Sequence, residues 1–330
     1  MTITWRTYRL KLRETFSISY GNYDFRDSLT VMLSSNGETG FGECVAINYY
    51  KIDLEAFAIS LARITKDVEN HKIVHPQEFF RFLLTLNLHP FLSSALDCAY
   101  WDLYGKLEIK SFTQLMNLDI VRLPESSFTI SIDTVDQQLR KINQSSWQKF
   151  KVKCSGLDWE AVYKLLNTDR EVALDLNASL SEDDCDFLQN NEHTAGFIYL
   201  EQPLPTGRFN GLDKNKHANW MCDEDCQSIR DLKLLAGHYN SVNIKVMKAG
   251  GITPALAMIS EARKFGFKVM IGCMTESTVG ISAGIALAGL CDYADLDGAN
   301  LISNDFANGS EVVLGHLHLS EKPGLGIRLR

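Results

Sequence analysis

The sequence lacks three features that would each have indicated a class of partner. It has no dense run of lysine and arginine, and its formal net charge is −8 over 330 residues, which argues against a nucleic-acid partner. Its longest strongly apolar stretch, residues 279–290, is too short to span a bilayer and is rich in glycine and alanine. We therefore expect a buried helix there and no membrane association. The eight histidines form no cluster.

Cysteine spacing excludes a second set of functions. Cys222 and Cys226 lie four residues apart, but no second pair and no histidine cluster follows at zinc spacing. Residues 1–10 alternate polar and apolar like a strand and lack the apolar core of a signal peptide. We therefore expect the eight cysteines to be reduced thiols in a cytoplasmic protein.

What the sequence does contain is a row of charges at the ends of successive apolar runs. These are Lys153, Asp175, Glu201, Asp223 and Lys245, spaced 22, 26, 22 and 22 residues apart. That spacing is typical of one strand, one helix and two short loops, so it indicates successive βα units. The simplest alternative is that each charge marks the point where a strand re-enters water. The order of five charges in register favours a shared site over that alternative.

The same rhythm predicts the fold class. We expect an α/β barrel of the (β/α)8 type, in which the carboxyl ends of parallel strands converge on one active-site face. Eight apolar strands are expected at residues 128–132, 150–153, 172–176, 197–201, 220–223, 242–245, 269–272 and 293–297.

The first third of the chain predicts a separate domain. Strands around 2–18, 28–34 and 39–45 are joined by turns at Gly21-Asn22 and Asn36-Gly37, and helical patterns follow at 53–69, 76–86 and 92–105. We therefore predict an N-terminal α+β capping domain at 1–122 and the barrel at 123–304. Residues 305–330 are expected to form a C-terminal segment that returns to the cap.

The three central carboxylates predict a magnesium site. Hard divalent cations prefer oxygen ligands, and Asp175, Glu201 and Asp223 would supply one carboxylate from each of three neighbouring strands. Asn177, two residues past Asp175, would point to the same side as a supporting group.

The two flanking lysines predict proton transfer. Their strands are second and sixth in the barrel, so Lys153 and Lys245 would approach a bound molecule from opposite faces. Lys151 shares the face of Lys153, and a neighbouring like charge lowers the pKa of a lysine towards that of a base. Two opposed bases beside a metal-held carboxylate suit removal of an α-proton, metal stabilisation of the resulting dianion and reprotonation from the other face. That reaction is racemisation or epimerisation.

These residues resemble the enolase superfamily and, within it, the muconate lactonizing enzyme subgroup. The resemblance covers most of the chain and rests on several motifs: Gly40-Phe41-Gly42-Glu43, residues 94–106, Lys151-Val152-Lys153, Asp175-Leu176-Asn177, Glu201-Gln202-Pro203, Asp223-Glu224 and residues 243–251. It implies that Lys153 and Lys245 are the acid/base pair and that Asp175, Glu201 and Asp223 bind Mg²⁺. Glu224 is expected to support them.

The sequence of residues 293–298 narrows the resemblance. Asp295 and Asp297 resemble the pair with which dipeptide epimerases, such as the L-Ala-D/L-Glu epimerases, hold the α-ammonium group of the substrate. Alternate residues of a strand share one face, so both could reach one cation; a solvated acidic loop is the alternative. Glu276 would add negative charge nearby, or would simply favour a helix N-terminus.

The sequence also departs from these epimerases. They carry an arginine in the loop after the first strand, where it meets the side-chain carboxylate of the substrate, and residues 16–23 contain none. Arg26 could substitute if the loop folds inward, and would otherwise be a surface residue. The glutamine usual after the Asn177 position is also absent. Both departures concern substrate choice.

The resemblance thus implies an isomerase that inverts the C-terminal residue of a dipeptide. Its partner would be this small molecule, and the chain could form a homo-oligomer. Two alternatives stay open. One is another member of the subgroup: an N-succinylamino acid racemase, o-succinylbenzoate synthase or muconate cycloisomerase, whose substrates carry no ammonium group. The other is a non-catalytic ligand-binding barrel.

Overall fold

A computed structural model describes residues 1–18 and 21–330. The N-terminal sheet is antiparallel and consists of β1 (Thr2–Ile18), β2 (Gly21–Ser35) and β3 (Glu38–Val45). The predicted turn at Asn36-Gly37 joins β2 to β3, with φ of 50° and 83°, as a two-residue hairpin requires. The structure places Gly21 and Asn22 within β2, paired with Ile18 and Ser17. The prediction of a turn at Gly21-Asn22 is therefore wrong, because both residues belong to the strand.

One buried helix joins this sheet to the rest of the cap. The helices are α1 (Leu54–Asn70), α2 (Pro76–Thr85), α3 (Pro90–Leu107) and α4 (Phe112–Met116), and η1 (Asn48–Tyr50) precedes them. Helix α3 is buried along nearly its whole length. It lies so close to β3 that a Cβ on Gly40 or Gly42 would sit 2.1 and 2.0 Å from the carbonyl oxygens of Ala99 and Ala95. The two glycines of the Gly-Phe-Gly-Glu motif therefore let the helix pack directly on the strand.

Eight parallel strands form the barrel sheet, in the order in which they occur in the chain. They are β4 (Phe128–Ile130), β5 (Lys149–Lys153), β6 (Glu171–Asp175), β7 (Leu200–Glu201), β8 (Trp220–Cys222), β9 (Ser241–Lys245), β10 (Lys268–Gly272) and β11 (Tyr293–Asp295). Each overlaps a predicted strand, so the predicted fold class is confirmed. Ser127 N donates to Ala294 O at 3.1 Å, which brings the first and last strands together.

Helices connect most of these strands. They are α5 (Val135–Gln144), α6 (Trp159–Leu166), α7 (Glu182–Asn190), α8 (Leu232–Leu235), α9 (Val246–Ala249), α10 (Ile252–Lys264) and α11 (Thr278–Ala288). Between β7 and β8 the structure has the short turn η3 (Phe209–Gly211) in place of a longer helix; η2 (Glu192–Gly196) and η4 (Gly298–Leu301) are similar turns. The apolar stretch at 279–290 is the buried helix α11, as expected. Across the described residues no helix is long and apolar enough to cross a membrane.

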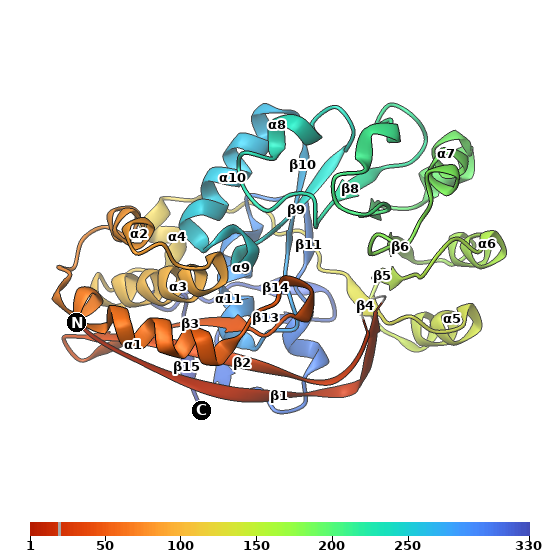
Figure 1. The fold of residues 1–330 in the computed structure, drawn as a ribbon. Helices are drawn as coiled ribbons and strands as arrows, with labels where there is room; N and C mark the ends of the chain where they lie inside the picture. Colours follow the sequence, from red (N-terminus) through yellow and green to blue (C-terminus); the bar gives the residue numbers. More distant parts are fainter. Residues whose placement is uncertain (19–20) are drawn as a thin grey trace.

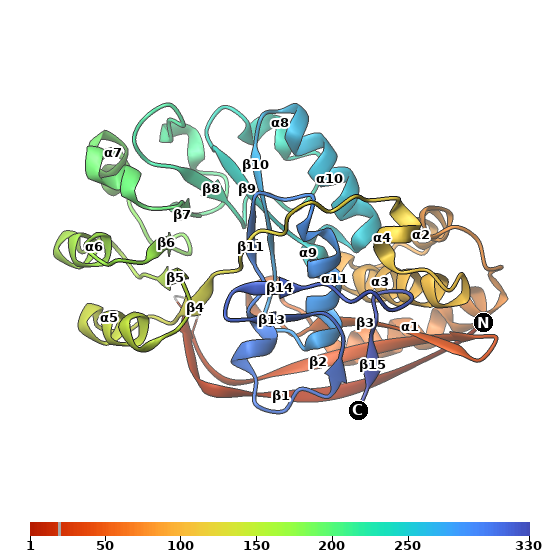
Figure 2. The ribbon, with the colours of Figure 1, turned by 180° about the vertical axis from the view of Figure 1, so that it is seen from behind.

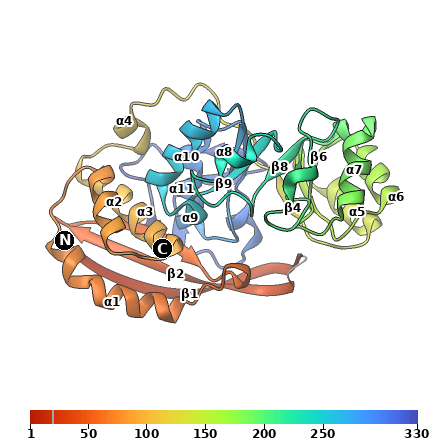
Figure 3. The same ribbon diagram turned by 45° about the horizontal axis from the view of Figure 1, so that its top comes forward.

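The cap covers only one side of the barrel. Helix α3 packs against α9 and α10, whereas α5, α6 and α7 lie on the side away from the cap helices (Figures 1 and 3). The β1–β2 hairpin is the exception, because its far end extends to the start of the barrel near β4 (Figure 2), where Ile132 N donates to Ser17 O at 3.0 Å.

The C-terminal segment forms two small ladders. Strand β12 (Ala307–Asn308) pairs with β15 (Arg328–Leu329), and β13 (Glu311–Val313) pairs with β14 (His316–His318). Leu325 N, in the loop before β15, donates to Asp102 on helix α3 at 2.8 Å.

Candidate active site

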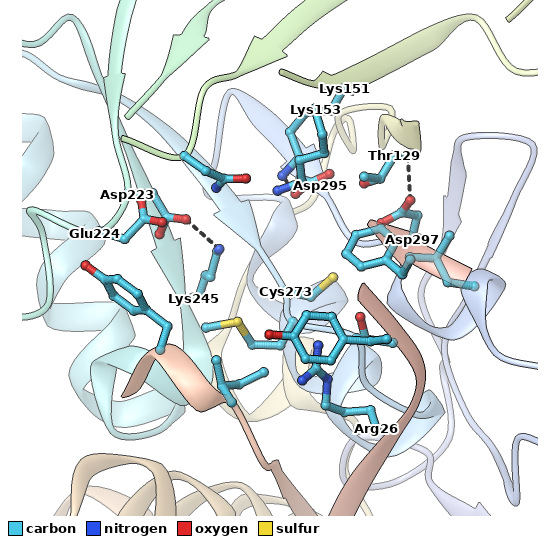
Figure 4. A pocket seen from close by; sticks show the side chains of 18 of the residues that line it. Arg26, Thr129, Lys151, Lys153, Asp223, Glu224, Lys245, Cys273, Asp295 and Asp297 are labelled. Carbon is cyan, nitrogen blue, oxygen red and sulfur yellow. Dashed lines mark hydrogen bonds and ion pairs between the residues drawn. The ribbon is translucent and has the colours of Figure 1, made fainter. Parts of the chain in front are cut away.

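The five charges found in the sequence meet at one end of the barrel. Lys153, Asp175, Glu201 and Lys245 are the last residues of β5, β6, β7 and β9, and Asp223 directly follows β8. Strand register places Lys153 beside Asp175 and Asp175 beside Glu201. All five side chains are buried, and Lys153, Asp223 and Lys245 line a cavity between barrel and cap (Figure 4).

Each of the two lysines contacts a carboxylate of this group. Lys153 Nζ donates to Asp175 Oδ2, and Lys245 Nζ donates to Asp223 Oδ2 at 2.6 Å. Burial favours the neutral amine of Lys245, but Asp223 and Glu201 outweigh it and hold the pKa of Lys245 well above its usual value. Lysine ammonium groups lower the pKa of the acids in turn. Burial would raise the pKa of Asp175, but Lys153 and Lys151 keep it below its ordinary range.

Lys151 lies among carboxylates of the barrel end. Its ammonium contacts Asp295 and lies 3.4 Å from Glu201 Oε2 and 3.7 Å from Asp175 Oδ2. Burial opposes the charge, but these three carboxylates hold the pKa of Lys151 well above its usual value. Lys151 is therefore a charged neighbour of the two lysines, and its effect on the pKa of Lys153 stays a prediction.

The acids outnumber the lysines at this end of the barrel. Arg26 on the cap wall is also buried, and the barrel end buries six carboxylates and four lysines; the acids are Asp175, Glu201, Asp223, Glu224, Asp295 and Asp297, and the lysines are Lys151, Lys153, Lys245 and Lys248. We call these ten acids and lysines the mouth cluster. Burial raises the pKa of Glu201 to about 7 and that of Glu224 to about 8, with the charge of Asp223 adding to the second. These two acids therefore hold their protons more tightly than usual, and a nearby cation would favour their ionised forms.

The donor set fits a magnesium ion. Glu201 Oε2 accepts no hydrogen bond from the described residues, and the strands place Asp175 and Asp223 on either side of Glu201. As arranged here, no group of three or more acidic, histidine or cysteine side chains within the described ranges is close enough to bind a metal. Lysine ammonium groups contact Asp175 and Asp223 and supply the positive charge that a metal ion would supply there. Carboxylate oxygens are nevertheless the donors that Mg²⁺ prefers.

Three buried residues hold the carboxylates in place. The backbone N–H of Asn177 donates to Asp175 Oδ1 at 3.1 Å, and Asn177 lines the cavity. Asn243 Nδ2 donates to Glu201 Oε1 at 2.6 Å, and Lys248 Nζ donates to Asp223 Oδ1 at 2.6 Å. No role for Asn243 or Lys248 was predicted from the sequence. The available signal was position: Asn243 is two residues before Lys245 on the same strand face, and Lys248 is three residues after it, on helix α9.

Asp295 and Asp297 both line the cavity, but they differ in their partners. Both oxygens of Asp295 are taken, Oδ1 by Ser127 Oγ at 3.0 Å and Oδ2 by Lys151. Asp297 Oδ2 accepts the backbone N–H of Thr129 at 2.6 Å. Burial, aided by Asp295, raises the pKa of Asp297 to about 7. Of the two acids, Asp297 is thus the one whose charge lacks a cationic partner at hydrogen-bond distance within the described chain.

The cap provides the opposite wall of the cavity, and Arg26 is part of it. Arg26 is only 6% exposed, so it is not the surface residue of the alternative. Its guanidinium donates to Ala46 O at 3.2 Å and lies 4.2 Å from the ring centroid of Tyr23. Burial lowers the pKa of Arg26, and within the described chain no carboxylate lies within ion-pair distance. Apolar and aromatic side chains complete this wall: Phe16, Ile47, Tyr49 and Tyr50.

Glu276 lies behind this cavity and is not among the residues that line it. Its Oε1 accepts Met274 N at 2.7 Å. Burial, together with the neighbouring Glu43, raises the pKa of Glu276 to about 8. Because it directly precedes Ser277, the N-cap of α11, its position matches the helix-terminus interpretation rather than substrate contact.

Comparison with known proteins gives consistent matches over the whole chain. Residues 134–330 match the family described as Enolase C-terminal domain-like. An L-Ala-D/L-amino acid epimerase from a Maribacter species is 36% identical over 94% of both chains. Another from Flavobacterium johnsoniae is 33% identical over 100% of both. The crystal structure of a dipeptide epimerase from Methylococcus capsulatus, complexed with Mg and the dipeptide L-Arg-D-Lys, superposes with a TM-score of 0.89 at 26% identity, covering 99% of both chains.

Proposed function

This chain belongs to the enolase superfamily and, within it, to the dipeptide epimerases; we therefore propose that it is a Mg²⁺-dependent isomerase that inverts the α-carbon of the C-terminal residue of a dipeptide. The observation that carries the proposal is that Lys153 and Lys245 enter one cavity from the second and sixth strands of the barrel. Two opposed proton carriers can remove a proton from one face of a carbon and return one to the other.

The two lysines account for the chemistry at the α-carbon. The neutral amine of one lysine accepts the α-proton: the C–H bond breaks, an N–H bond forms, and the electron pair moves towards the substrate carboxylate. The ammonium group of the other lysine then returns a proton to the opposite face. The direction of the reaction decides which lysine is the base, because the two stereoisomers present their α-protons to different sides.

Asp175, Glu201 and Asp223 would hold the magnesium ion. When bound, Mg²⁺ supplies positive charge against the negative charge that develops on the substrate carboxylate. Asn177, Asn243 and Lys248 fix these carboxylates through the hydrogen bonds described above. The buried position of the group excludes water, which makes each charge interaction stronger than it would be at the surface.

Two further groups of the dipeptide, its α-ammonium group and the side chain of its C-terminal residue, have partners of suitable charge. Asp297 faces the cavity with a carboxylate that an α-ammonium group would neutralise. Arg26, on the cap wall, would meet the side chain of the C-terminal residue. We therefore expect a preference for L-Ala-L-Glu over L-Ala-L-Leu, and we expect Arg26→Met to remove that preference in competitive turnover assays.

The test is α-proton exchange in D2O with Mg²⁺ and a set of L,L-dipeptides, read by mass spectrometry and chiral analysis. Lys153→Ala and Lys245→Ala should each lower epimerisation by roughly 10²–10⁴-fold. One variant should still exchange the α-proton of the L,L-isomer without inversion, and the other that of the L,D-isomer. Lys149→Ala is the matched control, because Lys149 is on the same strand but pairs with Glu171 at 3.4 Å outside the cavity.

Two outcomes would contradict the proposal. Turnover of N-succinylamino acids with no exchange on any dipeptide would assign the chain to the N-acylated branch of the subgroup. Binding of dipeptide and Mg²⁺ with no exchange at all would leave a non-catalytic barrel.

A further inference from the structure

Gln202 is a fully buried residue that none of the functions assigned above uses. It directly follows Glu201 at the end of β7 and is not among the residues that line the active-site cavity. Its φ of 39° lies in the left-handed region, which a residue with a Cβ adopts only where surrounding contacts hold it there. Those contacts connect Gln202 to the segments that carry the three carboxylates of the expected magnesium site.

The side-chain amide of Gln202 bridges to the loop after β8. Its Oε1 accepts the backbone N–H of Asp223 at 3.1 Å and that of Asp225 at 3.2 Å. Its Nε2 donates to Leu204 O at 2.8 Å and to Asp225 Oδ2 at 2.9 Å. Both ends of the amide are thus occupied, and they join the residue after Glu201 to the backbone of Asp223.

The backbone of Gln202 reaches the segment of the third carboxylate. Its carbonyl oxygen accepts Ala178 N at 2.7 Å, and Ala178 lies in the turn that follows Asp175. Ala178 and Asn177 also have left-handed φ, of 61° and 40°. Strained backbone persists only where the surrounding structure fixes it. Here it occurs at the ends of the neighbouring strands β6 and β7, and Gln202 is common to the contacts of both.

Asp225 and Tyr239 hold Gln202 from outside the cavity. Asp225 Oδ2 accepts the hydroxyl of Tyr239 at 2.8 Å as well as Gln202 Nε2, and Asp225 Oδ1 accepts Gly207 N at 2.7 Å. Tyr239 is buried between α8 and β9. Neither Asp225 nor Tyr239 is among the residues that line the active-site cavity. Their contacts therefore act on the position of Gln202 and, through it, on that of Asp223.

The spacing of the carboxylates decides which ion such a site prefers. Mg²⁺ requires near-ideal octahedral geometry with metal–oxygen distances of about 2.0–2.1 Å, whereas Ca²⁺ accepts about 2.3–2.6 Å and a flexible geometry. A site whose ligands cannot move apart therefore favours the smaller ion. Groups that hold metal ligands in place typically change metal affinity by about 10–100-fold when they are removed.

We propose that Gln202, held by Asp225 and Tyr239, is a positioning residue: it fixes the spacing of the three metal-binding carboxylates and so makes the site prefer Mg²⁺ to Ca²⁺. The inference rests on the proposed function, because it takes those carboxylates as the metal ligands. It adds to that function the selectivity of the site between two ions of equal charge.

The experiment measures the dissociation constants of Mg²⁺ and Ca²⁺ by isothermal titration calorimetry on the metal-free, full-length protein. The selectivity ratio is the Ca²⁺ constant divided by the Mg²⁺ constant, and we expect it to exceed one in the unmodified protein. Gln202→Met keeps the length of the side chain but removes its hydrogen bonds. It should weaken Mg²⁺ binding roughly 10–100-fold and Ca²⁺ binding less, so that the ratio falls at least about threefold. Tyr239→Phe removes one hydroxyl and keeps the ring, so it should lower the ratio in the same direction with less risk to folding.

Gln189→Met and Tyr100→Phe are matched controls. The amide of Gln189 is also buried and also joins two segments, since it donates to Gly211 O at 3.2 Å and accepts Asp213 N at 3.0 Å. The hydroxyl of Tyr100 bonds to the N–H and the carbonyl of Val74 in the cap. Both variants lose buried hydrogen bonds outside the metal site and should leave the selectivity ratio unchanged.

A ratio that falls in Gln202→Met and Tyr239→Phe, and in neither control, supports the inference. Unchanged Mg²⁺ affinity in both variants, or equal losses for the two ions, overturns it, because a merely structural role does not distinguish the ions. Either of these results leaves the proposed function intact as long as the unmodified protein binds Mg²⁺. If the unmodified protein binds no Mg²⁺, the proposed function fails and the inference fails with it.

Discussion

Buried carboxylates occur in two regions of this molecule, and their partners differ. In the mouth cluster, Asp175, Asp223 and Asp295 accept from lysine ammonium groups. Where cap and barrel meet, the acids accept from backbone N–H groups: Asp97 from Thr253 at the start of α10, and Glu43 from Ser277 and Gly280 at the start of α11. A carboxylate that accepts from backbone N–H groups keeps those partners. A carboxylate that accepts from a lysine ammonium group can instead bind another cation in place of the lysine.

The second region explains how the cap is attached. Asp97 lies on α3 of the cap, and its two oxygens accept Thr253 N and Thr253 Oγ1, each at 2.8 Å. Glu43, on β3, likewise caps α11. The capping domain thus places an acid at the N-terminus of two barrel helices, where the partial positive charge of the helix favours it. Asp102 holds the C-terminal segment differently: it accepts Leu325 N and also pairs with Lys106 at 2.7 Å.

The largest expected difference between the two regions concerns activity. Asp223→Asn keeps the shape of the side chain but removes one charge from the mouth cluster. We expect kcat/KM to fall by roughly 10²–10³-fold and the Mg²⁺ concentration for half-maximal turnover to rise. Asp97→Asn, the same exchange at the interface, should retain turnover of the same order. Magnesium titrations of both variants measure this, and equal losses in the two would remove the distinction.

For stability, we expect the larger effect in the second region, where cap and barrel meet. Asp97→Ala leaves the N–H and hydroxyl of the half-buried Thr253 without their acceptor and removes the acid at the N-terminus of α10. We expect the free energy of unfolding to fall by about 2–4 kcal/mol. Urea unfolding is the measurement. Asp53→Ala is the matched control, because Asp53 caps α1 at the exposed surface, where losing the cap costs about 1 kcal/mol. Equal losses in Asp97→Ala and Asp53→Ala would show that cap attachment does not depend on Asp97.

The two regions also differ in how far the sequence could predict them. The charges of the mouth cluster follow a strand period, so their positions alone placed Lys153, Asp175, Glu201, Asp223 and Lys245 at one end of the barrel. The period could not predict their pairing. Lys151 faces Asp295, which is 144 residues away, and only closure of the barrel brings the first and last strands together.

The role of the acids between cap and barrel is less evident from the sequence. Asp97 lies within a helix whose spacing predicts burial, but its partner Thr253 is 156 residues further along the chain. No local pattern marks an acid that caps a helix of another domain. Arg26 was uncertain for a related reason: whether it faces solvent or the cavity depends on how the β1–β2 hairpin folds towards the barrel, and this is a tertiary contact.

A double-mutant cycle tests whether Lys151 and Asp295 of the mouth cluster act as a unit. Lys151→Met leaves Asp295 without its ammonium partner, and Asp295→Asn leaves Lys151 with only Glu201 and Asp175, whereas the double variant removes both charges. We expect a coupling of about 1–3 kcal/mol in the free energy of unfolding. Asp97→Asn with Glu43→Gln is the control pair. These acids cap different helices and share no hydrogen-bond donor, so their effects should add within about 0.5 kcal/mol. Additive effects at Lys151 and Asp295 would contradict the coupling.

The smallest expected effect is the pH dependence of the interface. Burial raises the pKa of Asp97 to about 7, above its ordinary value of 3.8, so the folded protein binds a proton more tightly at this site than the unfolded chain does. The stability gained by that proton is complete below about pH 3.8 and is lost as the pH rises towards 7. Asp97→Asn does not titrate. The stability of the unmodified protein relative to this variant should therefore fall between pH 4 and 7 and stay level above it. Urea unfolding of both proteins across that range gives the difference directly, and shifts at other carboxyls, such as Asp102, cancel because both proteins contain them. A difference that is constant with pH would mean that Asp97 remains ionised on the helix N-terminus, as Asp175 does beside Lys153 and Lys151.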